Sequence, residues 1–464
     1  MRTIHRIAIG VLVGLFFASG YAARKECARR QAALIVAKDN KAVFEGTRIA
    51  STRLADVSGD VDIRPLETLY TVLNRLREHY VEQLTVEDEG KMTHEAMRAM
   101  LAWFRDPNTR FIEQPERRVV LDAEHGKFHG IGAVLAIKQI WRPSKDKPKE
   151  RVSEEHLVVV TLLPGSPAAK AGLKPGDEIV AIDGRDVLPF DPYQHVSDLV
   201  GTDRFRDTTD SQKRKMLDAE QKRIDEGIGI VEAEALLTGE QKKAVTLTLA
   251  AKPPAKPTRL TILPQDMVVD VVGDPRMETS TIGYIDINYF GSTTADEFAQ
   301  ALRELQAKSA KALIVDLRGA TGGDMGAALK IAQWFEPGRN LAVLIKSRGR
   351  KTVIQVPSTN NGEPWRKPVV LLVDRGTARA PEVLAAGLRE VGAAKLVGEK
   401  TYGNFTDSTL IDLADGSGIV MATGKYVTAK GYDYNGKGLP VDVQAATSDE
   451  QMKAAIKLLT GGKS

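Results

Sequence analysis

The stretch KPVVLLVDRGTARAPEVLAAGLREVG, residues 367–392, decides the fold of the C-terminal half of this chain. It begins with an uninterrupted apolar run at residues 369–373, which is typical of a strand buried on both faces of a sheet. After the turn residues Asp374, Arg375 and Gly376, apolar side chains recur at helical spacing over residues 380–390. A buried strand that leads directly into a helix predicts an α/β sheet.

The same alternation of strand and helix continues on the N-terminal side of this stretch. We expect strands at residues 282–290 and 312–319 and helices at residues 294–308 and 324–335. This order predicts βαβ crossovers. The glycine loop at Gly322 and Gly323 is not a phosphate loop, because no Gly-Lys-Ser/Thr sequence follows it.

Composition restricts the class of protein. The 464 residues are 42% hydrophobic and 27% charged, which is enough for two or three globular domains. The formal charge of +4 is small and the basic residues are dispersed, so we expect no nucleic-acid partner. The single cysteine, Cys27, excludes a disulfide framework, and the seven histidines form no metal-binding pair, so we expect neither a metal nor another cofactor.

Residues 1–30 have the layout of an export signal. Arg2 and Arg6 precede an apolar run at residues 7–23, and further basic residues follow it. The run can be a cleaved signal peptide or an uncleaved membrane anchor. Both alternatives predict an exported protein of the periplasm or cell envelope, which touches the membrane only through this segment.

A helical N-terminal region is expected at residues 60–125, followed by a PDZ-like domain at residues 126–252. The signature LVVVTLLPGSPAAKAGLKPGDEIVAIDGRDV, residues 157–187, closely resembles a PDZ domain, which binds the C-terminal tail of a peptide at a sheet edge. The loop Gly130-Ile131-Gly132-Ala133 precedes the signature, as in circularly permuted PDZ modules. Two glycines around an apolar residue suit a backbone nest for a carboxylate, so these four residues are the expected tail-binding site.

Three further boundaries follow from composition. A charged, helix-like insertion at about 202–243 separates the PDZ signature from its last strand, and we interpret it as a solvated surface excursion. The proline-rich segment KPPAKP, residues 252–257, indicates a domain boundary. The α/β core is expected at residues 258–445 and a C-terminal tail or helix at residues 446–464.

From about residue 66 to 443, the chain resembles the C-terminal processing peptidases, also called tail-specific proteases. The resemblance rests on FHGIGA, on the PDZ signature, and on the core motifs IVDLRGATGG, GTARAPEV, GEKTYGN and TGKYVTAKGYDYNGKGLPVDV. It implies a peptidase-like core with a serine-lysine dyad and a PDZ domain that recruits unstructured C-terminal tails.

The dyad itself is replaced in this chain. The resemblance places Arg379 at the nucleophile position, Asn404 at the position of the basic lysine, and Ser408 at the position of a glutamine that orients the lysine. Arginine is protonated and neutral asparagine cannot act as a base. The backbone N–H groups of Gly319 and Ala380 would correspond to the family's oxyanion hole. We therefore favour a pseudopeptidase, which binds tails through its PDZ domain or regulates an active homologue.

Two alternatives stay open. Thr377 and Lys400 could supply a relocated nucleophile and base, which would make the chain an active periplasmic serine-type endopeptidase. The second alternative is that the chain is a structural protein of envelope assembly. Arg379 suits the binding of a peptide carboxylate, although simple loss of function explains its presence equally well.

Overall fold

The computed structural model describes residues 64–104, 106, 108–143, 151–238, 243–250, 257–358 and 363–461. The chain divides into two compact units, residues 1–92 with 196–201 and residues 93–195 with 202–464. The predicted signal or anchor lies outside the described residues. Among those that are described, no helix has both the length and the apolar character needed to cross a membrane.

In the smaller unit, helix α2 (Arg64–His79) is followed by the beginning of α3 (Val86–Ala102). The guanidinium of Arg77 on α2 donates two hydrogen bonds of 2.6 Å to the carboxylate of Glu89 on α3. Leu66, Leu69 and Tyr70 of α2 are exposed. The region predicted to be helical thus contains the two helices α2 and α3.

The larger unit contains the PDZ domain. Its sheet runs from β3 (Ala133–Pro143) through β4 (Arg151–Leu162) to β5 (Glu178–Ile182), and β5 also pairs with β8 (Val245–Leu249). The other elements of the domain are α5 (Pro167–Lys170), β6 (Arg185–Leu188), α7 (Asp203–Arg206), α8 (Asp210–Glu226), β7 (Ile228–Gly229), α9 (Ile230–Thr238) and β9 (Thr258–Ile262). Most of helix α6 (Gln194–Gly201) belongs to the smaller unit.

The expected solvated insertion is only partly solvated. Helix α8 has no buried residue, as predicted from its charge. Helix α9 differs, because Ile230, Ala233 and Leu237 are buried in the same apolar core as the PDZ strands. These three residues follow one another at helical spacing and form one face of α9. The last part of the segment is therefore a structural helix of the PDZ domain.

The proline-rich segment also has a different role from the one expected. Strand β9, which follows it, pairs antiparallel with β8, which precedes it, from Val245 opposite Ile262 to Leu249 opposite Thr258. Residues 252–257 therefore connect two neighbouring strands of one sheet, and the PDZ domain continues to Ile262. Proline and lysine are common where a chain leaves a sheet edge, which is why the composition suggested a boundary.

The core is built on a six-stranded sheet in the order β11-β12-β13-β16-β17-β20. The pairs from β12 to β20 are parallel, and only β11 is antiparallel to its neighbour. The strands are β11 (Arg276–Met277), β12 (Ile282–Asp286), β13 (Ala312–Asp316), β16 (Val369–Val373), β17 (Lys395–Gly398) and β20 (Val443–Gln444). The predicted α/β sheet with crossovers is thus confirmed.

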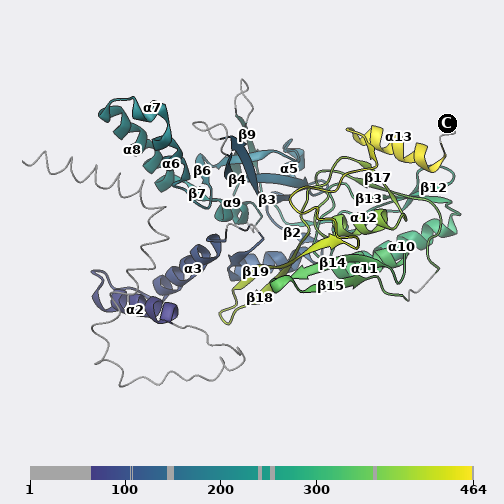
Figure 1. Ribbon diagram of the computed structural model, residues 1–464, viewed down its shortest axis with the longest axis horizontal. Helices are drawn as coiled ribbons and strands as arrows, with labels where there is room; N and C mark the ends of the chain where they lie inside the picture. The colour runs from purple at the N-terminus through teal and green to yellow at the C-terminus, as the bar shows by residue number, and fades with distance from the viewer. Residues whose placement is uncertain are drawn as a thin grey trace, which may run out of the picture. The chain divides into compact units, whose positions relative to one another are not determined.

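Helices cover both faces of this sheet (Figure 1). Helices α10 (Thr294–Ala307), α11 (Met325–Gln333) and α12 (Ala380–Glu390) share the main apolar core with one face. Helix α13 (Ser448–Leu459) packs on the other face and buries Ala455. All residues of β13 and β16 are buried, which explains their uninterrupted apolar sequences.

A second, antiparallel sheet joins the N-terminal region to the core. Strand β1 (Arg110–Ile112) pairs with β19 (Gly418–Thr428), which also pairs with β14 (Asn340–Lys346) and β18 (Thr406–Asp412). The remaining elements are α4 (Gln114–Ala123), β2 (Lys127–Phe128), β10 (Met267–Val268), the 3-10 turn η1 (Ser347–Gly349) and β15 (Lys351–Gln355).

Candidate functional site

Arg379 lies at a sharp turn between the end of β16 and the start of α12. Its backbone has φ 66° and ψ −128°, a conformation that residues other than glycine rarely adopt. A strained strand-to-helix turn of this kind exposes the nucleophile in other hydrolase folds. The turn therefore presents the Arg379 side chain at the carboxyl end of a parallel sheet, where ligands of α/β proteins bind.

Asp374, the first residue after β16, fixes the beginning of this turn. Its carboxylate accepts hydrogen bonds from the N–H groups of Gly319 at 2.8 Å, Gly376 at 2.9 Å and Thr377 at 3.1 Å. Burial raises the pKa of Asp374, and the two glycine N–H groups oppose that rise. The carboxylate thus connects the turn to the end of the neighbouring strand β13.

Glu382 fixes the end of the turn and connects it to the loop before β18. This carboxylate is fully buried and accepts N–H hydrogen bonds from Arg379 at 3.2 Å, Gly403 at 2.6 Å and Asn404 at 2.8 Å. The hydroxyl of Thr401 donates to it as well. Burial raises its pKa to about 7, against the effect of these four donors. One side chain therefore holds the backbone of both positions that the dyad would occupy.

The side chain of Asn404 is engaged in structural hydrogen bonds. Its amide nitrogen donates to the side-chain oxygen of Asn108 at 3.1 Å, and its amide oxygen accepts the N–H of Thr406 at 3.1 Å. The hydroxyl of Ser408 is buried and has no hydrogen-bond partner among the described residues. Asn404 therefore connects the N-terminal region to β18 and has no proton-accepting nitrogen to offer.

Arg379 is half-buried, and Tyr289, Arg110 and Glu234 act electrostatically on its guanidinium. Burial lowers its pKa; Tyr289 and Glu234 oppose this effect, and Arg110 adds to it. An arginine nevertheless stays protonated at neutral pH. In the part of the chain that the structure covers, no hydrogen bond or ion pair of the guanidinium is found.

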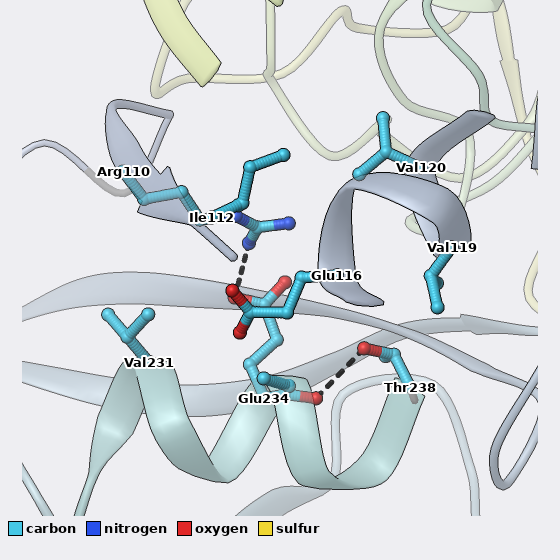
Figure 2. Close-up of a pocket in the computed structure, with 9 residues that line it drawn as sticks. Arg110, Ile112, Glu116, Val119, Val120, Val231, Glu234 and Thr238 are labelled. Atoms are coloured by element: carbon cyan, nitrogen blue, oxygen red, sulfur yellow. Dashed lines mark hydrogen bonds and ion pairs between the residues drawn. The ribbon is translucent and has the colours of Figure 1, made fainter. Parts of the chain in front are cut away.

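Glu234 does not neutralise Arg379, because it already forms an ion pair with Arg110 at 2.7 Å. Figure 2 shows this pair at a small pocket between β1, α4 and α9, with Glu116 beside it. The two paired side chains are 30% and 13% exposed, so the pair is largely shielded from water. It joins the PDZ helix to the strand that pairs with the core.

The loop predicted to bind a tail, Gly130 to Ala133, contains two glycines with positive φ. Gly130 and Gly132 have φ of 87° and 74°, and Ile131 is fully buried between them. The N–H of Ile131 donates to the carbonyl oxygen of Leu237 at 2.9 Å. A tail carboxylate that uses this N–H must therefore displace the last turn of α9. Ala133 follows the loop as the first residue of β3.

The sequence comparisons agree with this architecture. Peptidase family S41 matches residues 281–445, and a PDZ domain matches residues 158–204. The chloroplastic C-terminal processing peptidase of Tetradesmus obliquus is 30% identical over 371 residues, which cover 80% of this chain and 71% of that protein. This chain belongs to the C-terminal processing peptidase family.

Two further comparisons extend the likeness to most of the chain. The carboxyl-terminal-processing protease of Synechocystis sp. is 28% identical over 402 residues, 83% of this chain and 81% of that protein. The solved structure of the photosystem II D1 C-terminal processing protease aligns with a TM-score of 0.56 and 25% identity, and covers 85% of this chain and 91% of that one. The α/β fold with its PDZ domain is therefore that of a C-terminal processing peptidase.

The hydroxyl of the alternative nucleophile, Thr377, is hydrogen-bonded inside the protein. Thr377 is fully buried, and its hydroxyl donates to the carbonyl oxygen of Leu317 at 2.8 Å and accepts the N–H of Asp374 at 3.0 Å. Lys400 is exposed, and within the described ranges it makes no hydrogen bond to Thr377. The relocated Thr377–Lys400 pair is therefore not formed, because the threonine hydroxyl stabilises the turn.

The two N–H groups that the resemblance assigned to an oxyanion hole already have acceptors in the structure. The N–H of Gly319 donates to Asp374, and the N–H of Ala380 donates to the carbonyl oxygen of Gly322 at 3.2 Å. Both N–H groups therefore have acceptors inside the protein. In this conformation neither is available to stabilise a negatively charged oxygen of a substrate.

Several site residues were not singled out from the sequence. Glu382 carried a partial signal, because a glutamate at the third position of a helix typically accepts a hydrogen bond from the residue before that helix. Asn108 and Glu234 gave none, since their partners lie 296 and 124 residues away. Within the described ranges, no group of three or more acidic, histidine or cysteine side chains is suited to hold a metal ion.

Proposed function

We propose that this chain is an exported, non-catalytic C-terminal processing peptidase homologue, which binds polypeptide tails through its PDZ domain or acts on an active homologue. One observation carries the proposal. The strained turn that would present a nucleophile presents Arg379, while the hydroxyl of the neighbouring Thr377 is bonded inside the protein.

The chemistry of serine-lysine peptidases supports this reading. Such an enzyme needs an exposed hydroxyl, a base that removes its proton and free donors for the oxyanion. Arg379 has no nucleophilic electron pair, and Asn404 cannot accept the proton. The N–H groups that would stabilise the oxyanion are already bonded. Each of the three requirements is therefore unmet, whereas loss of a single group could have left partial activity.

Tail binding is supported by the edge of the PDZ sheet. Among the described strands, β3 pairs only with β4, and α9 packs against it. A peptide can add to such an edge as a further strand, with its carboxylate in the glycine loop that begins at Gly130. The hydrogen bond between Ile131 and Leu237 predicts that α9 shifts when the carboxylate enters.

Fluorescence anisotropy with labelled peptides tests the binding half of the proposal. We expect an apolar-tailed peptide with a free carboxylate to bind the full-length chain, and the same peptide with an amidated C-terminus to bind at least about tenfold more weakly, since a charge-assisted hydrogen bond contributes about 1.5–3 kcal/mol. Equal affinity for the two peptides would remove the basis for tail recognition and favour a structural, envelope-assembly role.

The catalytic half is tested by incubation with an unfolded protein that ends in an apolar tail. We expect no cleavage. Cleavage that disappears in Thr377→Ala would instead identify an active endopeptidase with a relocated nucleophile. For the alternative role as a regulator, the same substrate is incubated with an active homologue in the presence and absence of this chain, and a changed cleavage rate is the expected result.

A further inference from the structure

The Arg379 guanidinium is a cation without a counter-charge in a partly desolvated position. Burial lowers its pKa, and the described residues provide it with no hydrogen bond and no ion pair. Glu234 is the carboxylate that acts electrostatically on Arg379, but it forms an ion pair with Arg110, with 2.7 Å between the nitrogen and the oxygen. Tyr289 is the other group that interacts with it electrostatically, and a phenol is neutral at physiological pH. A partly buried cation without a counter-charge is stabilised by a bound anion.

Two glycines, Gly322 and Gly323, form the backbone next to Arg379. A Cβ on Gly323 would lie 4.0 Å from the Nη1 atom of Arg379, and Gly322 is adjacent because its carbonyl accepts the N–H of Ala380. The N–H groups of Gly322 and Gly323 have no acceptor among the described residues. A guanidinium beside two unpaired backbone donors matches the two oxygens of a carboxylate.

We propose that Arg379 and the Gly322-Gly323 loop bind the C-terminal carboxylate of an extended polypeptide, a second carboxylate site separate from the PDZ loop. This inference rests on the proposed function, since it assumes that tails reach the turn at Arg379 and are not cut there. No bond forms or breaks in this step. Arg379 holds the end of the chain as a bidentate, charge-assisted partner.

A chain end suits the position of the Arg379 guanidinium better than an internal segment does. The nucleophile of a peptidase lies next to the carbonyl carbon of the residue that becomes the new C-terminus. Arg379 stands at the same backbone position, and its longer side chain puts a cation where the carbonyl group of an uncut chain would lie. An uncut chain would place a neutral amide against the cation and gain less from it. The site therefore selects product-like tails.

The test uses a fluorescent peptide with a free C-terminus and a photo-crosslinking residue at its penultimate position. Full-length wild type, Arg379→Gln and the matched control Arg375→Gln are compared, and crosslinked positions are mapped by mass spectrometry. Arg375 lies in the same turn but is exposed and paired with Glu399 at 2.7 Å. Thermal melting verifies that both variants are folded.

We expect crosslinks to residues 319–323 and 379–380. For Arg379→Gln, half-maximal crosslinking should need an about 10- to 100-fold higher peptide concentration, whereas Arg375→Gln should behave like wild type. The amidated peptide should give no such crosslinks. Crosslinks confined to residues 130–133 and α9 would overturn this inference and leave the proposed function in place. Crosslinks around residue 379 that persist unchanged in Arg379→Gln would overturn the inference as well, whereas cleavage of the peptide would overturn the proposed function.

Discussion

Replacing Glu382 by glutamine tests whether one buried carboxyl group holds the turn together. In the folded protein the pKa of Glu382 is about 7, above the ordinary value of 4.5 expected when the chain is unfolded. The folded state therefore binds more protons between these two pH values. The contribution of this group to stability is fully present below about pH 4.5 and is lost as the pH rises through about 7.

The size of the effect follows from the same values. At 1.36 kcal/mol per pK unit, the full contribution is about 3 kcal/mol, of which about 2.5 kcal/mol is lost between pH 5 and pH 8. Glutamine does not titrate, so it lacks this dependence. It also places an NH₂ group against donors such as the N–H of Gly403, which costs about 1–3 kcal/mol for each donor left unpaired. We expect Glu382→Gln to destabilise the core more at pH 5 than at pH 8.

Urea denaturation at 25 °C measures this difference. Trp334 and Trp365 are buried in the core, and their fluorescence follows its unfolding. Glu399→Gln is the matched control, because Glu399 forms an exposed ion pair with Arg375 and should contribute less than about 1 kcal/mol. A destabilisation by Glu382→Gln that is equal at the two pH values, or larger at pH 8, would refute the argument.

Three other substitutions test single features. Arg379→Gly should raise the unfolding free energy of the core in urea by about 1 kcal/mol, since glycine adopts a φ of 66° without strain, and a decrease would contradict a strained turn. Gly130→Ala should lower the melting temperature of the PDZ domain and abolish tail binding, because its Cβ would lie 2.1 Å from the carbonyl oxygen of Leu237; normal binding would exclude that loop. Glu234→Gln should cost about 1–3 kcal/mol by leaving Arg110 unpaired, and a double-mutant cycle with Arg110→Gln that gives no coupling would disprove the ion pair.

Much of the fold could be predicted because burial leaves a direct trace in the sequence. The apolar run at Val369–Val373 is buried at every residue, and the following helix begins at Ala380, where helical spacing begins in the sequence. The PDZ signature at residues 157–187 likewise contains the PDZ strand β5, Glu178–Ile182. Each of these elements consists of contiguous residues, so the local sequence pattern is sufficient to predict it.

The errors arose where local composition and tertiary packing disagree. Ile230, Ala233 and Leu237 form a buried helical face. The segment was predicted to be solvated because the helix before them is highly charged. The N–H of Gly319 was read as an oxyanion donor, yet Asp374, 55 residues later in the chain, accepts it. Such long-range hydrogen bonds depend on how the strands are ordered in the sheet, which one sequence does not specify.

Intact-mass analysis of a substrate under single-turnover conditions tests the central claim most directly. The full-length chain is mixed in equimolar amount with an unfolded, apolar-tailed protein, so that even one cleavage per molecule is visible. The substrate should keep its full mass with wild type and Thr377→Ala alike. A C-terminally shortened product that increases with the concentration of the wild-type chain, and is lost in Thr377→Ala or Arg379→Gln, would contradict the proposal that this scaffold has no nucleophile.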